Sequence, residues 1–154
     1  MVRPANARGV ALDVLDRVLG EARPLDETFA GHPALVSLDG RDRAFARLLV
    51  TVTLRRLGQI DAVLDQFLRS RPKALGVHDL LRLGAAQLLF LDTPAHAAVA
   101  ETVTLATGPH AFAKGLINAV LRRVGREGSE QLAGQDAARL NTPDWLWQSW
   151  CEAY

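Results

Sequence analysis

The chain has 154 residues, of which 49% are hydrophobic and 23% are charged, and its formal net charge is +1. This length and composition suit one domain with a sizeable buried core, and the small net charge excludes binding to nucleic acid by global attraction. A single cysteine excludes an intramolecular disulfide, and neither a signal peptide nor an apolar run long enough to span a membrane is recognised. These features are typical of a cytoplasmic protein, and any nucleic-acid binding must come from a local basic patch.

Helical periodicity dominates the first half of the chain. Asn6 is placed to cap a helix that runs to about Glu21, and residues 22–38 predict a connection with a short helical turn at 25–30. A long helix is expected to begin at Asp39 and to reach about Leu57, and a shorter amphipathic helix follows at 60–68. The apolar face of the long helix is predicted to consist of Phe45, Leu48, Leu49 and Val52.

The second half of the chain begins with its most apolar helix, predicted at 77–90. Gly84 in that helix is expected to mark a close crossing with another helix, and His78 near its start is expected at the surface. Thr93 and Pro94 predict the start of the next helix, which runs to about Ala106.

The stretch 111–123 predicts an amphipathic helix with a basic side. Apolar residues recur every four positions and indicate a core face, while a second row of the same spacing carries cations and an amide. Gly115 interrupts the helix at a cost of about 1 kcal/mol relative to alanine, so another backbone is expected close to it. The expected core face is Phe112, Leu116, Ile117, Val120 and Val124, and the polar row is Lys114, Asn118 and Arg122.

The periodicity is lost after Val124, and several glycines predict a linker up to about Leu140. The sequence Asn141-Thr142-Pro143-Asp144 then predicts a capped start for a last helix. Because large exposed apolar side chains usually mark contact surfaces, the tryptophans of this helix are candidates for contact with another domain. They are Trp145, Trp147 and Trp150. No segment alternates with period two, so the expected fold class is all-α, with seven or eight helices.

Two stretches, 43–60 and 102–126, contain four basic residues each and no acidic residue. If their helices pack side by side, they form one basic surface that contacts phosphates. The alternative is that these cations lie on solvated helix faces, and that Asn118 is a buried amide tying two helices together. The candidates for contact with RNA are Arg43, Arg47, Arg55, Arg56, Lys114, Asn118, Arg122 and Arg123.

Catalytic and cofactor-binding patterns are missing from the sequence. The four histidines lack metal-ligand spacing, the glycines form no phosphate-binding loop, and His96 and Glu101 lack a third group that would make them a catalytic pair. Cys151 stands beside a tryptophan in neither the Pro-Cys nor the Thr-Cys setting of a cytosine-attacking thiolate. We therefore expect no metal, no cofactor and no catalytic residue in this chain.

The run AKGLINAVLRR at 113–123, preceded by PAHAAVAETVTLA at 94–106, carries a family resemblance. It resembles the helical N-terminal domain of the bacterial 16S rRNA (cytosine-5) methyltransferases of the RsmB type, also called Sun or Fmu, which is similar to the antitermination protein NusB. The resemblance implies a NusB-like RNA-binding domain at 1–126 and, at 127–154, a linker and connector toward a C-terminal methyltransferase domain. That domain would bind S-adenosylmethionine, the partner of this chain would be ribosomal RNA, and Arg8 in the opening turn would contact phosphate.

Two other functions are compatible with the same fold. One is a stand-alone antitermination factor of the NusB type, which binds a transcript and a ribosomal protein. The other is a helical protein-interaction module that does not touch RNA, which the modest net charge and the scarcity of aromatic residues on the basic helices favour.

Overall fold

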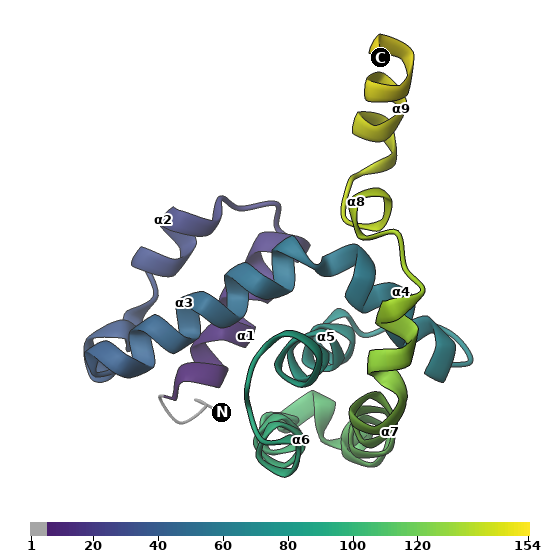
Figure 1. Ribbon diagram of the computed structural model, residues 1–154. Helices are drawn as coiled ribbons and strands as arrows, with labels where there is room; N and C mark the ends of the chain where they lie inside the picture. Colours follow the sequence, from purple (N-terminus) through teal and green to yellow (C-terminus); the bar gives the residue numbers. More distant parts are fainter. Residues whose placement is uncertain (1–5) are drawn as a thin grey trace.

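The computed structural model describes residues 6–154, and throughout that part of the chain the regular secondary structure is helical, as predicted (Figure 1). Nine α-helices and two 3-10 turns follow one another within these residues. They are α1 (Ala7–Gly20), α2 (Leu25–Ala30), η1 (Pro33–Ser37), α3 (Gly40–Arg55), α4 (Leu57–Phe67), α5 (Leu75–Phe90), α6 (Ala95–Thr104), η2 (Gly108–Ala113), α7 (Lys114–Ala133), α8 (Ala137–Leu140) and α9 (Asp144–Ala153).

Helix α5 is the centre of the fold, because α1, α3, α4, α6 and α7 all pack against it. Its leucines Leu80, Leu81 and Leu83 are fully buried, as its apolar sequence predicts. A Cβ added at Gly84 would lie 2.4 Å from Cδ1 of Leu121, so the missing side chain lets α7 approach. The predicted close crossing at Gly84 is confirmed, and it joins α5 to α7.

The predicted cap at Asn6 is confirmed, and Asp39, where a helix was expected to begin, is the N-cap of α3. The Asn6 side chain accepts a hydrogen bond of 2.7 Å from the backbone amide of Gly9, and Asp39 accepts one of 2.7 Å from Asp42. Each satisfies an amide that has no carbonyl partner within its own helix. These local contacts therefore define where α1 and α3 begin.

The buried face of α3 is rotated from the predicted one. Leu49 is buried as expected, but Leu48 is 49% exposed. The residues that face α1 and α5 include Ala46, Val50 and Thr53, and the Thr53 hydroxyl is satisfied by donating to the carbonyl of Leu49 over 2.7 Å. Ala46 and Thr53 therefore occupy the core, whereas the hydrophobic pattern had assigned the larger Leu48 to it.

The amphipathic stretch 111–123 is only partly the helix that was predicted. Phe112 belongs to the 3-10 turn η2 and is 78% exposed, and Leu116 is 45% exposed, so both are wrong as core residues. Because α7 begins at Lys114, its register places Ile117, Val120 and Val124 in the core, together with Leu121. A Cβ at Gly115 would meet no atom within 4 Å, so the expected close backbone is not there.

Helix α7 continues to Ala133, through the residues for which loss of periodicity predicted a linker. Two glycines caused this error, because they lie where α7 passes close to α5. A Cβ at Gly128 would lie 2.7 Å from Cδ2 of Leu89, and one at Gly125 would lie 3.6 Å from Cδ2 of Leu88. These glycines are contact residues of a continuous helix, and they do not end it.

Residues 134–142 bind back onto the start of α4. The carbonyl of Leu140 approaches so closely that a Cβ on Gly58 would lie 1.6 Å from its oxygen. The amide of Gln59 donates to Asn141 Oδ1 over 3.0 Å, and Asn141 Nδ2 donates to Gln59 Oε1 over 2.8 Å. Gln135 Nε2 adds a bond of 3.2 Å to the Gln59 carbonyl.

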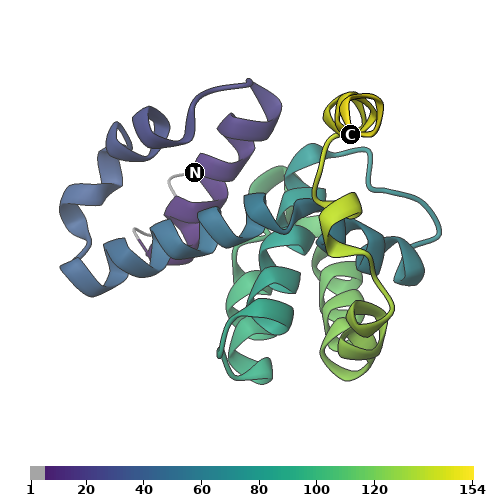
Figure 2. The same ribbon diagram turned by 45° about the horizontal axis from the view of Figure 1, so that its top comes forward.

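Asn141 was expected to help cap the last helix, but its side chain caps α4 instead. Helix α9 starts after Pro143 without a side-chain cap. From the docked segment, α9 projects away from the other helices toward the C-terminus (Figures 1 and 2). Of the helices in the part of the chain described, none is both long and apolar enough to cross a membrane.

Candidate nucleic-acid interface

Helix α7 presents basic side chains in two directions. Asn118, Arg122 and Arg126 are spaced by four residues and form one row, which faces α6. Arg123 lies on the side of α7 that faces α4, where its guanidinium stands over the ring of Phe67, 4.6 Å from the centroid. A single helix therefore lines two different clefts.

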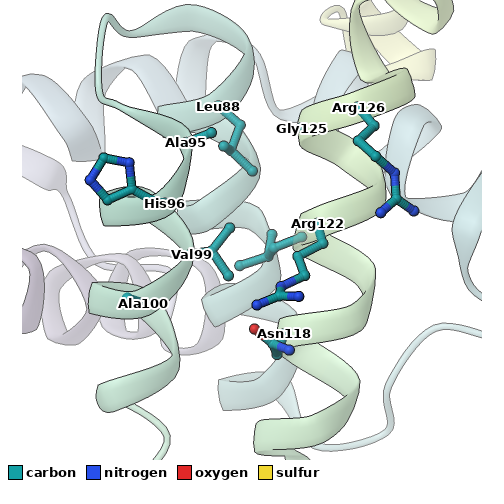
Figure 3. A pocket seen from close by; sticks show the side chains of 10 residues that line it. Leu88, Ala95, His96, Val99, Ala100, Asn118, Arg122, Gly125 and Arg126 are labelled. Atoms are coloured by element: carbon teal, nitrogen blue, oxygen red, sulfur yellow. The ribbon is translucent and has the colours of Figure 1, made fainter.

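The first cleft is a groove of about 570 Å³ between α6 and α7, which we call the α6–α7 groove. Its floor is apolar, and Asn118 and Arg122 stand on its α7 side. In Figure 3 the guanidinium of Arg122 reaches toward α6 directly above the Asn118 amide, His96 lies on the α6 side, and the end of Arg126 turns away from α6. The lining residues are Leu88, Ala95, His96, Val99, Ala100, Asn118, Leu121, Arg122, Gly125 and Arg126, so none of the described residues lining the groove is acidic.

Several predicted contact residues carry a charge that no carboxylate neutralises within residues 6–154. They are Arg55, Lys114 and Arg122, which have neither an ion pair nor a hydrogen bond with another described side chain; Arg126, which was not predicted, shares this property. Asn118 is half-buried and has no hydrogen-bond partner in the same part of the chain, so it does not tie two helices together. Arg122 and Asn118 thus offer free donors side by side.

Two other candidates are already ion-paired. Arg47 pairs with Asp26 and lies over the ring of Phe29, and Arg123 pairs with Glu127 at 3.2 Å. Exposed pairs of this kind contribute about 0–1 kcal/mol, so a phosphate can displace the carboxylate at little cost. Their attraction for a polyanion is nevertheless weaker than that of an unpaired arginine.

Three further candidates keep their charge but are held by neutral oxygens. Arg8 Nε donates to Gln87 Oε1 over 2.7 Å, Arg43 Nε donates to the Leu35 carbonyl over 2.9 Å, and Arg56 donates to Gln59 Oε1 over 3.2 Å. Arg8 also lies over the ring of Phe45 and Arg56 over that of Phe90. These contacts orient the arginines and leave their charge uncompensated. Arg8 is half-buried and ties α1 to α5 through Gln87, so it has a structural role whether or not it contacts phosphate.

The two acid-poor stretches do not pack side by side. Helix α3 packs on α1 and α5, whereas α7 packs on α4, α5 and α6. In Figures 1 and 2 the two helices lie on different parts of the molecule. The condition for a single basic surface is therefore not met, and the basic residues of α7 form a separate surface from those of α3.

Sequence reasoning missed a second basic cleft, which lies on the other side of α7 and measures about 540 Å³. Arg69 and Lys73, from the loop between α4 and α5, line it together with Arg123 and the partly exposed Leu116. The signal was present in the run RSRPK at 69–73, where three cations surround a proline, but none of these residues was among the predicted contacts. Arg71 in the same run is occupied, because it forms two hydrogen bonds of 2.9 and 3.1 Å with Asp65.

A buried group of charges ties α4 to α5, and the sequence analysis did not identify it. Arg82 donates two hydrogen bonds of 2.8 Å to Asp61 and one of 2.9 Å to Asp79. The side chains of Arg82, Asp61 and Asp79 are 12%, 13% and 3% exposed. His78 lies 3.4 Å from Asp61 and is buried, so its expected place at the surface was wrong. Arg82 satisfies Asp61 and Asp79, whereas Nε2 of His78 is buried beside Asp61 without a hydrogen bond, and the group is structural.

Asp61 is held ionised by its neighbours. Burial by itself would raise the pKa of its carboxyl, but the hydrogen bonds and charges of Arg82 and His78 outweigh burial and lower the pKa from 3.8 to about 2. Arg82 is likewise held in its charged form, because the contacts with Asp61 and Asp79 raise its pKa against the effect of burial.

The lowered pKa of Asp61 predicts an acid-dependent stability. Its contribution, about 2 kcal/mol, should be fully present above the unfolded pKa near 3.8 and should be lost as pH falls through about 2. Urea unfolding across this range measures it, with Asp61→Asn as the control that removes the titrating group. If the stability difference between the two proteins does not shrink toward low pH, this assignment is wrong.

Two of the three tryptophans of α9 are exposed. Trp145 and Trp150 are 69% and 49% exposed, and Trp147 is half-buried with the Arg139 guanidinium over its ring at 5.3 Å. Trp147, Trp150, Cys151 and Tyr154 line a shallow cleft of about 410 Å³ on α9 alone. Cys151 is a free cysteine and is exposed there. No three His, Cys, Asp or Glu side chains within residues 6–154 are grouped so that they could hold a metal ion.

The chain is similar in sequence to known ribosomal RNA methyltransferases. The chain is 39% identical over 142 residues to the ribosomal RNA small subunit methyltransferase B of Pseudomonas putida (strain KT2440), covering 83% of this chain and 33% of that protein. It is 34% identical over 160 residues to the protein of the same name from Escherichia coli O1:K1, covering all of this chain and 37% of that protein. The chain thus spans about a third of the length of these relatives.

The fold has a solved counterpart in T. maritima NusB. The two structures superpose with a TM-score of 0.69 at 21% sequence identity, covering 82% of this chain and 94% of that one. The sequence model of the NusB family matches residues 5–126. Together with the methyltransferase relatives, this match confirms the predicted resemblance, and the chain belongs to the NusB family.

Proposed function

We propose that this chain is an RNA-binding domain that docks small-subunit ribosomal RNA for a cytosine-5 methyltransferase. Its relatives are named for methylation of that RNA, and it spans about a third of their length. The observation that carries the proposal is the unpaired Arg122 beside the free Asn118 amide, on a helix face without acidic lining residues. Unpaired arginines on such a face give electrostatic affinity for a phosphate backbone.

The proposed RNA-facing residues divide into primary and supporting contacts. Arg122, Arg126, Asn118 and Lys114 on α7 are the primary contacts, because no described carboxylate competes for them. The other candidates either lie on α1, α3 and the α3–α4 junction or are already ion-paired, and we assign them a supporting role. They are Arg8, Arg43, Arg47, Arg55, Arg56 and Arg123.

Catalysis and cofactor binding are proposed to lie outside these residues. S-adenosylmethionine, which would supply the methyl group, needs a strand-loop-helix turn, and the described part of the chain contains no strand. The donors of the α6–α7 groove are cationic and therefore do not suit the sulfonium of that cofactor. Within this proposal the chain binds and orients RNA and carries out no chemical step.

We further propose a functional division at about residue 126, within the continuous helix α7. Residues 1–126 are the RNA-binding domain, and 127–154 lead toward the methyltransferase domain, which Trp145, Trp147 and Trp150 would contact. The exposure of Trp145 and Trp150 supports such a contact. The docked segment 134–142 gives the connector a fixed starting point, because it is hydrogen-bonded to Gln59.

Salt-dependent RNA binding tests the proposal. With a single-stranded fragment of small-subunit ribosomal RNA, four phosphate contacts predict a slope of log K against log salt on the order of −3, from about −0.7 per phosphate. Replacing Arg122 and Arg126 together by alanine should reduce this slope by about 1.4 and weaken binding on the order of tenfold at moderate salt. Filter binding at several salt concentrations measures both quantities.

The matched control removes the same net charge from ion-paired positions. Arg23 pairs with Glu21 and Arg71 with Asp65, and neither arginine belongs to the proposed RNA-facing set, so the double variant Arg23→Ala/Arg71→Ala should change the slope much less. Equal losses from the two double variants would show that binding follows net charge and not the α7 face. A wild-type protein that binds no RNA would exclude the function, and would favour a protein-interaction module.

A stand-alone antitermination factor is the second candidate. The T. maritima NusB structure favours it, because 94% of that chain is covered by this fold. Helix α9 favours the methyltransferase domain, since its exposed tryptophans lack a partner within the described residues. A reading frame that continues past Tyr154 into a methyl-donor domain would decide for the first candidate, and a stop codon shortly after Tyr154 for the second.

A further inference from the structure

The α6–α7 groove combines an apolar floor with donors on one wall. We propose that this groove takes an unstacked base of a single-stranded RNA, with an adjoining phosphate on Arg122. The inference rests on the proposed function and names the form of RNA that the domain accepts.

The phosphate position follows from a difference between neighbouring arginines. Arg123 is ion-paired with Glu127, whereas Arg122 has no carboxylate partner in the described chain, and none of the described groove-lining residues is acidic. A guanidinium forks onto phosphate oxygens with two parallel hydrogen bonds. Arg122 reaches across the groove toward α6, so its donors stand at the mouth (Figure 3).

The base position follows from the size and polarity of the groove. Its volume of about 570 Å³ lies within the range of small-molecule sites. Leu88, Val99 and Leu121 form the floor, and the walls are opened by residues with small side chains or none, namely Ala95, Ala100 and Gly125. A planar, weakly polar ring fits such a space, whereas a hydrated phosphate alone would leave the apolar floor uncovered.

Asn118 supplies the polar contact that a base edge needs. Its amide carries both a donor and an acceptor, and it is half-buried without a partner within residues 6–154. It lies on the groove wall next to Arg122, one helical turn away (Figure 3). Proteins that recognise single-stranded RNA use side chains of this kind to bind the edges of splayed bases.

The second basic cleft is the weaker candidate for the same role. Two of its arginines, Arg71 and Arg123, are paired with Asp65 and Glu127, and its lining residues include no asparagine or glutamine. It offers cations without a free amide. The two clefts lie on opposite sides of α7, so they can be tested separately.

Filling the groove without changing charge tests the proposal. Ala100 is exposed and lines the α6–α7 groove, while Ala119 is exposed and lines the second cleft. The variant Ala100→Leu should weaken binding of a short single-stranded ribosomal RNA on the order of tenfold, which is the effect of losing one accommodated base. Ala119→Leu should bind like the wild type, and thermal unfolding should show that both variants remain folded.

A strand of abasic sugars with the same number of phosphates is the second probe. The wild type should bind it on the order of tenfold more weakly than the intact strand, and Ala100→Leu should bind the two strands equally, with an unchanged salt slope. Equal binding of both strands by the wild type, no effect of Ala100→Leu, or a loss confined to Ala119→Leu would each overturn the groove assignment. Those results leave the proposed function intact, provided that RNA still binds through α7, whereas absence of any RNA binding removes the proposed function itself.

Discussion

Replacing Arg82 by methionine is expected to lower the free energy of unfolding by about 3–5 kcal/mol, because it leaves two buried carboxylates without their partner. Arg82 is the shared donor of Asp61 and Asp79, whose side chains are only 13% and 3% exposed. Methionine fills much of the space of the arginine stem, so lost packing explains little of the effect. Urea unfolding at neutral pH measures the change.

The matched control is an arginine with the same bonding pattern at the surface. Arg71 also donates two hydrogen bonds to one aspartate, Asp65, but the two side chains are 56% and 39% exposed. Arg71→Met is therefore expected to cost less than about 1 kcal/mol. Similar losses for both variants would contradict the view that burial makes the Arg82 contacts important.

The dependence of the Arg82→Met loss on pH separates charge from packing. Without Arg82, the buried carboxyl of Asp61 loses its main counter-charge, so burial raises its pKa above the unfolded value. Protonation then favours the folded variant, and the deficit relative to wild type should shrink as pH falls from neutral toward 4. A deficit that is constant with pH would mean that the variant loses packing alone.

Replacing Gly58 by alanine is expected to release the segment 134–142 from α4. The added Cβ would lie 1.6 Å from the carbonyl oxygen of Leu140, and because that atom is backbone, no side-chain rotation relieves the clash. The bonds of Gln59 to Asn141 and Gln135 would break with the displacement, and stability should fall by about 1–3 kcal/mol. The tryptophan helix α9 would lose its fixed direction.

Hydrogen exchange at the Gln59 amide reports this release directly. That amide lies in the first turn of α4, where no helical carbonyl is available, and Asn141 is its acceptor. It should exchange much faster in Gly58→Ala, together with faster proteolysis within 134–142. The same substitution at Gly115, where a Cβ would meet nothing within 4 Å, should stabilise α7 by up to about 1 kcal/mol. Unchanged protection of Gln59 would show that the segment is not held as described.

The positions of the helices followed well from the sequence, because helical periodicity and capping act over a few neighbouring residues. The cap at Asn6, the helix start at Asp39 and the turn at 25–30 are confirmed for this reason. Errors in the helix bounds arose where one residue type is compatible with two structural roles. Gly125 and Gly128 were taken to break a helix, but the helix continues through both, and Gly128 makes room for Leu89 of α5.

The candidate interface was predictable only in its parts. Arg122 and Asn118 were recognised from their spacing on one helix, and the structure brings both to one groove. Which arginines are neutralised was not predictable, since Asp26 lies 21 residues from Arg47 and pairing depends on how α2 meets α3. For the same reason, the sequence left open whether α3 and α7 share one basic surface, and in the structure the two helices do not pack together.

What the sequence determined by itself is the all-α class, the order and approximate bounds of its helices, and the family, because these depend on local pattern and on motif identity. The tertiary structure alone decided the partner of each helix face. It placed His78 in a buried charge group, turned Asn141 from its own helix to the start of α4, and opened the groove between α6 and α7. Such contacts join residues far apart in the chain, and their energies depend on burial and mutual geometry, which exist only once the helices have packed.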